Sequence, residues 1–170
     1  MSAGFGGRLI GSVKAGVEQY TGIEPCEKTY YGLLNMIEDF KCKAEIIKDG
    51  SENFIRKDTY DLAFTSPPYF DTEKYDENES QSYKKYPTKE EWIEKYLKKT
   101  FENTYDSLKS KARMIINIAN VKTFTDLEER TIQKAKETGF KLENTLNLSL
   151  SSINKGGFKF EPVFVFKKEL

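Results

Sequence analysis

The chain has 170 residues, of which 38% are hydrophobic and 14% aromatic, which suits one globular domain with a single core. Lysine and arginine together number 27, as do aspartate and glutamate, so overall charge does not favour a protein that coats nucleic acid. The absence of histidine excludes a histidine base, and only two cysteines argue against a disulfide framework or zinc site. We therefore expect no bound metal.

The amino-terminal segment "MSAGFGGRLIGSVKAGV" is small and apolar, but Arg8 and Lys14 interrupt it too early for a signal peptide. No apolar run approaches the length that spans a membrane. We expect a cytoplasmic protein without a membrane partner.

Helix and strand patterns alternate through the first half of the chain. A glycine-rich opening is followed by a short helix at 8–15, and residues 27–40 have the apolar spacing of a second helix. Strands are expected at 20–24, where Pro25 ends the pattern, and at 44–48 and 60–65.

The second half begins with a polar stretch at 71–87, which we expect to be a mobile loop. Thr88 and Glu91 have the spacing of a capping box, which predicts a long helix to residue 108. A nearly continuous apolar run at 112–121 predicts a central strand. A helix at 127–138 and two antiparallel strands, "FKLENTLNLSL" and "FKFEPVFVFKK", complete the pattern.

This order predicts a single α/β domain over 1–170, with a mostly parallel sheet, helices on both faces and a late antiparallel strand pair. Ligands of such sheets bind beyond the carboxyl ends of the strands. Four segments are expected at that edge: "AGFGG", Glu24, "DGSEN" and "TSPPYF".

The segment "AGFGG" before a helix offers exposed N–H groups, and Glu24 follows Gly4 by 20 residues, a spacing that suits a ribose hydroxyl pair. Each feature alone is equally consistent with an ordinary turn or a solvated strand end. Together they indicate a bound nucleoside. No lysine followed by serine or threonine comes after the glycines, which excludes a phosphate loop for ATP.

In "TSPPYF", two prolines end a strand at the point where its ladder bonds cease, and they fix the preceding carbonyls. A rigid row of acceptors beside Tyr69 suits a flat ring that carries an amino group. The alternative is a proline-rich strand exit with a packing tyrosine.

The order of these segments resembles the S-adenosylmethionine-dependent amino-methyltransferases that modify DNA at adenine N6 or cytosine N4, including those of restriction–modification systems. Residues 66–69 match that family's [DNS]-P-P-[YF] motif fully, whereas "FGG" with Gly4 matches its cofactor loop loosely. The serine form is similar to the cytosine-N4 subset, although adenine-N6 members carry it too.

The resemblance implies a Rossmann-like fold, with S-adenosylmethionine as cofactor and DNA, its target base flipped out, as partner. It implies that the target amino group is held by Ser66 and the Pro67 carbonyl beside Pro68, and that Tyr69 stacks on the base. The implied cofactor residues are Gly4, Phe5 and Gly7 at the methionine portion, Glu24 at the ribose, and Asp49 or Ser51 at the adenine.

Two departures from the family pattern leave alternatives open. The family's first strand belongs directly before "AGFGG", where only Met1 and Ser2 stand, so that strand is expected to be missing and a partner chain or dimer to be needed. The second departure is that no segment is long enough for a separate target-recognition domain. The candidate DNA contact is therefore "QSYKKYP", with Lys84 and Lys85 among tyrosines, although the acidic half of 71–87 argues against it. Two alternatives to a DNA methyltransferase stay open. One is a truncated or split, non-catalytic module that needs a partner chain, and the other is a methyltransferase that acts on RNA or on a protein glutamine amide.

Overall fold

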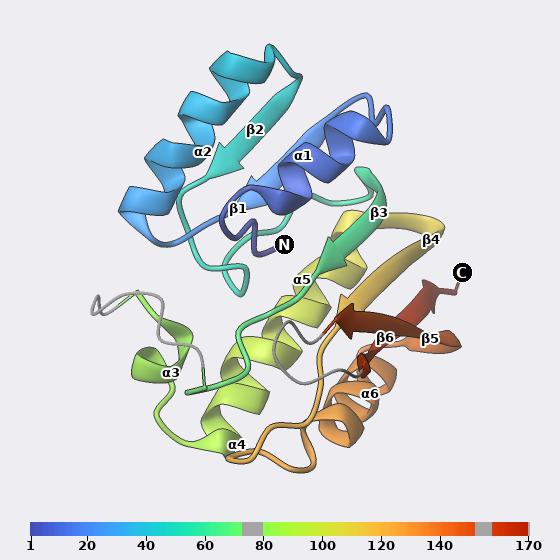
Figure 1. The fold of residues 1–170 in the computed structure, drawn as a ribbon. Helices are drawn as coiled ribbons and strands as arrows, with labels where there is room; N and C mark the ends of the chain where they lie inside the picture. Colours follow the sequence, from blue (N-terminus) through green and yellow to red (C-terminus); the bar gives the residue numbers. More distant parts are fainter. Residues whose placement is uncertain (73–79, 152–157, 170) are drawn as a thin grey trace.

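A computed structural model describes residues 1–72, 80–151 and 158–169 as an α/β fold with two sheets (Figure 1). The smaller sheet pairs β1 (Tyr20–Ile23) with β2 (Ala44–Ile47) in parallel. The larger sheet has the order β3-β4-β6-β5, in which β3 and β4 are parallel and the last two strands are antiparallel to their neighbours. This arrangement confirms the predicted fold class.

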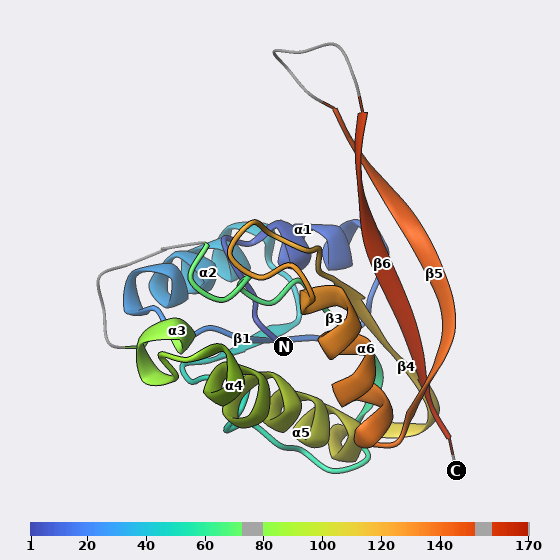
Figure 2. The same cartoon turned by 90° about the horizontal axis from the view of Figure 1, so that it is seen from below.

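The remaining elements pack on both sides of these strands. Figure 2 shows α1 and α2 on one side, with α4 and α5 on the other. Their bounds, in chain order, are α1 (Gly7–Lys14), α2 (Glu27–Phe40), β3 (Tyr60–Thr65), α3 (Ser82–Lys85), α4 (Lys89–Glu91), the π-helix η1 (Trp92–Lys98), α5 (Lys99–Ser107), β4 (Leu108–Asn117), α6 (Leu127–Glu137), β5 (Phe140–Ser151) and β6 (Phe158–Lys168).

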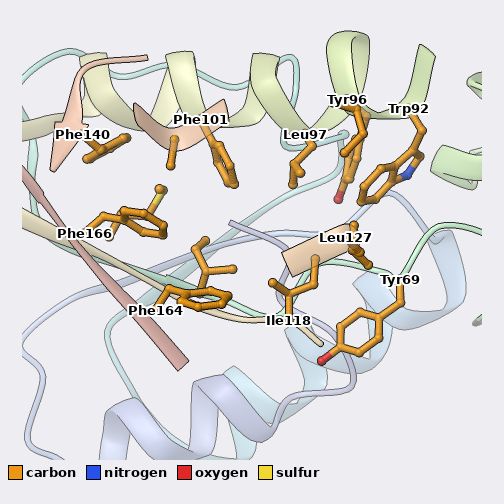
Figure 3. Close-up of a cluster of buried hydrophobic side chains, with 14 of the residues drawn as sticks. Tyr69, Trp92, Tyr96, Leu97, Phe101, Ile118, Leu127, Phe140, Phe164 and Phe166 are labelled. Atoms are coloured by element: carbon orange, nitrogen blue, oxygen red, sulfur yellow. The ribbon is translucent and has the colours of Figure 1, made fainter. Parts of the chain in front are cut away.

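The main core lies between the larger sheet and the continuous helical segment from α4 to α5 (Figure 3). Trp92, Phe101 and Phe166 are fully buried in it. A second, smaller cluster joins α1 and α2 to β2 through Leu9, Leu33 and Ile46. The two clusters explain why apolar residues recur at helical spacing in α2 and again from α4 to α5.

The predicted capping box is confirmed, since Thr88 Oγ1 accepts a hydrogen bond from the backbone N–H of Glu91 at 3.2 Å. The strand predicted at 112–121 is displaced and instead occupies Leu108–Asn117. The prediction followed the apolar run, but β4 also includes the exposed residues 109–111 before that run. Within this exposed segment, Lys111 adopts a φ of 65°. Ile118 and Ala119 lie beyond the strand and remain buried.

Within the polar stretch 71–87, residues 82–85 form α3, and residues 73–79 lie outside the described part of the chain. Its mobility stays a prediction. Within residues 1–72, 80–151 and 158–169, no helix is both long and apolar enough to cross a membrane.

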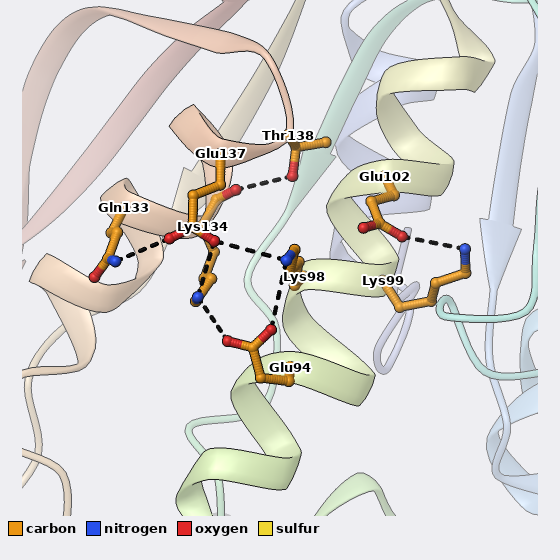
Figure 4. A network of polar contacts seen from close by, with 8 residues as sticks. All are labelled: Glu94, Lys98, Lys99, Glu102, Gln133, Lys134, Glu137 and Thr138. Atoms are coloured by element: carbon orange, nitrogen blue, oxygen red, sulfur yellow. Dashed lines mark hydrogen bonds and ion pairs between the residues drawn. The ribbon is translucent and has the colours of Figure 1, made fainter.

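A polar network joins η1 to α6 on the surface (Figure 4). Lys134 Nζ lies 2.6 Å from Glu94 Oε1 and 2.9 Å from Glu137 Oε2, and Lys98 approaches the same two carboxylates at 3.6 and 3.7 Å. The hydrogen bond from Lys134 lowers the pKa of both glutamates. These carboxylates therefore stabilise the fold above their usual pKa, and that contribution is lost as pH falls through the lowered values.

The Lys134→Met variant tests this network. At pH 7 we expect a Tm about 2 °C below that of the native chain, because Lys134 is the most buried cation of the network. At about pH 3 the two proteins should melt closer together, because the glutamates are then protonated in both. Thermal melts monitored by circular dichroism measure the difference, and a gap that does not change with pH would contradict this account.

Candidate functional site

The glycine loop leads directly into α1. Ala3 is buried, Gly4 and Gly6 adopt φ values of 61° and 95°, and the helix begins at Gly7. The φ of Gly6 strains any other residue, and a Cβ there would also displace the Met36 sulfur, 2.5 Å away. Phe5 is 72% exposed. The loop therefore has the predicted form, a tight turn before a helix start.

Arg8, on the first turn of α1, joins the glycine loop to the strand exit at residues 66–69. Its Nη1 donates to the Ser2 carbonyl at 3.1 Å, and its Nη2 donates to the Ser66 carbonyl at 3.0 Å. Gly4 lies against the same guanidinium, since a Cβ there would be 2.8 Å from Nη1. Arg8 was not predicted as a site residue, and the sequence pattern gives no signal for this bridge.

Glu24 follows β1 and is only 8% exposed. Its Oε1 accepts the backbone N–H of Cys26 at 3.0 Å. Burial raises the pKa of Glu24, and hydrogen bonds from the Cys26 and Gly4 backbones and the charge of Arg8 act in the opposite direction. The structure thus brings Glu24 against the glycine loop, as the spacing predicted.

The segment after β2 presents its two predicted residues differently. Asp49 Oδ1 accepts from the Gly50 N–H at 2.6 Å and from Asn53 Nδ2 at 2.7 Å, which shapes the turn. Ser51 is 5% exposed and bonds to Thr100 on α5, with the two hydroxyl oxygens 3.1 Å apart. Asp49 thus serves the loop's own backbone, and Ser51 anchors that loop to α5.

Glu52 was not predicted, although it stands in the same "DGSEN" segment. Its side chain is 4% exposed, its Oε1 lies 3.5 Å from Lys85 Nζ, and its Oε2 has no hydrogen-bond partner. The carboxylate also raises the pKa of Tyr86, after the larger effect of burial. Lys85, proposed from the sequence as a DNA contact, is therefore ion-paired with Glu52, and this pair ties α3 to the loop after β2.

The strand exit "SPPYF" lies directly after β3. Pro67 is buried and Ser66 and Pro68 are half-buried, while Phe70 turns back into the core with a φ of 55°. The Phe70 ring makes edge contacts with Trp92 and Phe124 at centroid distances of 6.1 Å. The packing of Phe70 in the core thus helps to hold the segment after β3 in one conformation.

Tyr69 is 8% exposed, and its hydroxyl donates to Glu161 Oε2 of β6 at 3.4 Å. Figure 3 shows its ring at the edge of the main core. The predicted catalytic tyrosine is thus largely covered in this structure. Two surface pockets lie elsewhere, one against α6 and one between α1 and Phe40, and neither contains a predicted site residue.

Comparison with known proteins gives a fold but no family. No protein-family model matches the chain, and no curated protein matches it either. A solved S-adenosylmethionine-dependent methyltransferase from Methanosarcina mazei matches with a TM-score of 0.66 and 11% identity, over 99% of this chain and 90% of that one.

Two further solved structures match this fold. The [4+2]-cyclase SpnF matches with a TM-score of 0.69 and 9% identity, over 99% of this chain and 74% of its own. The 1,6-didemethyltoxoflavin-N1-methyltransferase of Burkholderia thailandensis, with bound 1,6-didemethyltoxoflavin and S-adenosylhomocysteine, matches at 0.67 and 10% identity, covering 99% and 68%. The chain therefore has the Rossmann-like fold found in S-adenosylmethionine-dependent methyltransferases.

Proposed function

We propose that this chain is an S-adenosylmethionine-dependent methyltransferase domain that modifies an exocyclic amino group in DNA, at cytosine N4 or adenine N6. The observation that carries the proposal is the Arg8 bridge, because it joins the "SPPY" strand exit to the glycine loop through the Ser66 and Ser2 carbonyls. The shared fold supports the methyltransferase part of the proposal. The acceptor part rests on the resemblance of residues 66–69.

On the cofactor side, the proposed residues follow the edge of the sheet. The N–H groups at the start of α1 face the methionine portion, and the Glu24 carboxylate accepts the ribose hydroxyls. Gly4 and Gly7 allow close approach of the cofactor to the backbone. Phe5, Asp49 and Ser51 complete the proposed set.

On the acceptor side, Ser66 and the Pro67 carbonyl accept hydrogen bonds from the target amino group, which turns its lone pair toward the methyl donor. Such a transfer needs positioning more than acid–base catalysis, which suits a chain without histidine. In duplex DNA the base must first leave the stack, at a cost of about a few kcal/mol. Tyr69 then supplies the stacking surface, once its ring is uncovered from β6.

Calorimetric titration with S-adenosylmethionine tests the cofactor half of the proposal. We expect the native chain to bind S-adenosylmethionine. Glu24→Ala should bind it at least about tenfold more weakly, because a buried carboxylate then no longer accepts the ribose hydroxyls. Glu18→Ala, an exposed carboxylate on the loop before β1, is the matched control.

The same titration has an expected pH dependence. Burial raises the pKa of Glu24, so its carboxylate becomes protonated at a higher pH than an exposed glutamate does. Affinity should therefore fall as pH falls through that raised pKa, and Glu24→Gln should remove this pH dependence. Equal S-adenosylmethionine affinity in the native chain, Glu24→Ala and Glu18→Ala would show that Glu24 is not part of the cofactor site.

A second candidate function is an incomplete, non-catalytic module that requires a partner chain. The strands of the described residues form two separate sheets, which favours this candidate. A methyltransferase of RNA or of a protein amide is the remaining alternative. Transfer of tritiated methyl groups to DNA, RNA and protein separates these acceptors, and label entering only RNA or protein would exclude the DNA proposal.

A further inference from the structure

Strand β5 forms an open edge of the larger sheet. Within the described residues it pairs only with β6, at the end of the order β3-β4-β6-β5. Figure 2 shows β5 and β6 as a long ribbon that extends past β4. All of residues 143–149 are exposed. An open edge of this kind presents a row of backbone N–H and C=O groups that another strand can bind.

The two edges of this ribbon differ in their protection against such pairing. Where β6 extends past β4, Lys159 and Glu161 carry charge and Pro162 lacks an N–H group. Charges and prolines of this kind keep an edge strand from pairing with another chain. In β5, residues 144–150 read "NTLNLSL", with neither a charge nor a proline. The edge of β5 is therefore the one that remains able to bind a strand.

The Pro162 carbonyl shows which backbone groups of β5 point outward. It accepts a hydrogen bond from Asn117 Nδ2 of β4 at 3.1 Å, so the backbone groups of Pro162 face away from β5. Its partner in β5 is Asn147, and opposite residues of an antiparallel pair direct their backbone groups either toward each other or both away. The N–H and C=O of Asn147 therefore face the open edge. Those of Thr145 and Ser149 do so too, because the direction alternates along a strand.

The sequence of this edge is complementary to itself. Two antiparallel copies of β5 can be aligned with Asn147 opposite Asn147, and Thr145 then falls opposite Ser149. In the same register Leu146 falls opposite Leu148. These leucines are 51% and 42% exposed and share one face of the strand, so each packs against a leucine of the second copy. The polar side chains meet on the other face, and residues 144–150 bring no charge into the contact.

We propose that the outer edge of β5 binds the same edge of a second copy of this chain, in an antiparallel pairing centred on Asn147. The contact is two-fold symmetric, so the same surface serves both copies. It joins the two four-stranded sheets into one continuous sheet. The proposal does not depend on methyl transfer, and its tests use no cofactor.

Sedimentation equilibrium of the 170-residue chain, between about 5 and 500 µM, tests the dimer. We expect a Kd of about 100 µM or below, as for a small interface. Asn147→Pro should weaken association at least about tenfold, because it removes an N–H that faces the open edge. The ladder with β6 does not use that N–H, so the Tm of the variant at about 5 µM should lie within about 3 °C of the native value. A native chain that stays monomeric at about 500 µM, or an Asn147→Pro variant that associates equally well, would overturn the proposal.

A second pair of variants separates contact through β5 from contact through another part of the sheet. Leu148→Lys should weaken association at least about tenfold, because the charge would lie opposite a leucine of the second copy. Leu62→Lys, at a 53% exposed position on β3, lies at the other end of the sheet and should leave the Kd within about twofold. Dissociation by Leu62→Lys and not by Leu148→Lys would place the contact on β3 and overturn the proposal.

Amide hydrogen exchange, followed by NMR at about 20 and 500 µM, tests which backbone groups take part. At the higher concentration we expect exchange about threefold slower or more at Thr145, Asn147 and Ser149. Leu146 and Leu148 should change less, because their N–H groups face β6 at both concentrations. Equal exchange of the outward amides at the two concentrations would contradict the pairing.

Disulfide formation tests the register. In the proposed pairing the Cα atoms of Leu146 and of Leu148 in the second copy lie about 4.5 Å apart, within the range that a disulfide bridges. The same residue in the two copies is separated by about 8 Å, which is too far. Under mild oxidation, an equimolar mixture of Leu146→Cys and Leu148→Cys should therefore cross-link. Each variant alone should give no more linked dimer than the native chain, which carries Cys26 and Cys42. Single variants that cross-link as efficiently as the mixture would overturn the register centred on Asn147.

Discussion

Replacing Trp92 by alanine is expected to lower the free energy of unfolding by about 3–5 kcal/mol, the largest stability change of any substitution considered. Trp92 is fully buried and lies at the start of η1. Its ring contacts Tyr96 at 5.1 Å, Phe70 at 6.1 Å and Phe124 at 6.4 Å between centroids. Alanine would leave a cavity among three aromatic rings.

The same substitution removes a polar tie. Trp92 Nε1 donates to Ser82 Oγ at 3.0 Å, which fastens α3 to η1. Urea unfolding measures the effect, with Trp92→Phe as a matched variant that keeps an aromatic ring and should lose less. Tyr31→Ala, at a half-exposed position on α2, serves as the surface control. A loss below about 1 kcal/mol in Trp92→Ala would contradict the packing described here.

Replacing Tyr69 by alanine is expected to reduce base methylation by about 100-fold or more, while S-adenosylmethionine affinity changes within a few-fold. The reason is that the ring supplies the stacking surface of the proposed acceptor site, worth about 1–3 kcal/mol per base, and also helps to position that base. Cofactor contacts are proposed at the glycine loop and Glu24, which are separate from the tyrosine ring.

Because Tyr69 is largely buried, its alanine variant also needs a check of folding. Tyr69→Phe keeps the ring and loses only the hydroxyl that donates to Glu161, so activity should remain within a few-fold. Single-turnover methylation with tritiated cofactor measures both variants, and circular dichroism verifies their fold. Activity of Tyr69→Ala within a few-fold of the native chain would exclude Tyr69 as the stacking residue.

The sequence was sufficient to predict the elements that depend on local patterns. The alternation of helix and strand, the Thr88 cap and the late antiparallel pair are all present. The proximity of Glu24 to the glycine loop was also predictable, because both segments were expected at the carboxyl ends of the strands, where ligand-binding segments of a parallel sheet gather.

Other features depend on contacts between distant residues, which no local pattern reports. The Arg8 bridge joins positions 58 residues apart, and the Glu52–Lys85 pair joins positions 33 apart. The π-helix at Trp92–Lys98 has the same apolar spacing as an α-helix in sequence. The burial of Tyr69 likewise depends on β6, which lies about 90 residues further along the chain.

The most direct test of the proposed function is mass spectrometry of nucleosides from DNA incubated with the protein and S-adenosylmethionine. N4-methylcytosine or N6-methyladenine should appear with the native chain, and its yield should be about 100-fold lower with Tyr69→Ala. Cofactor binding by the native chain without any methylated base in DNA would contradict the proposed function.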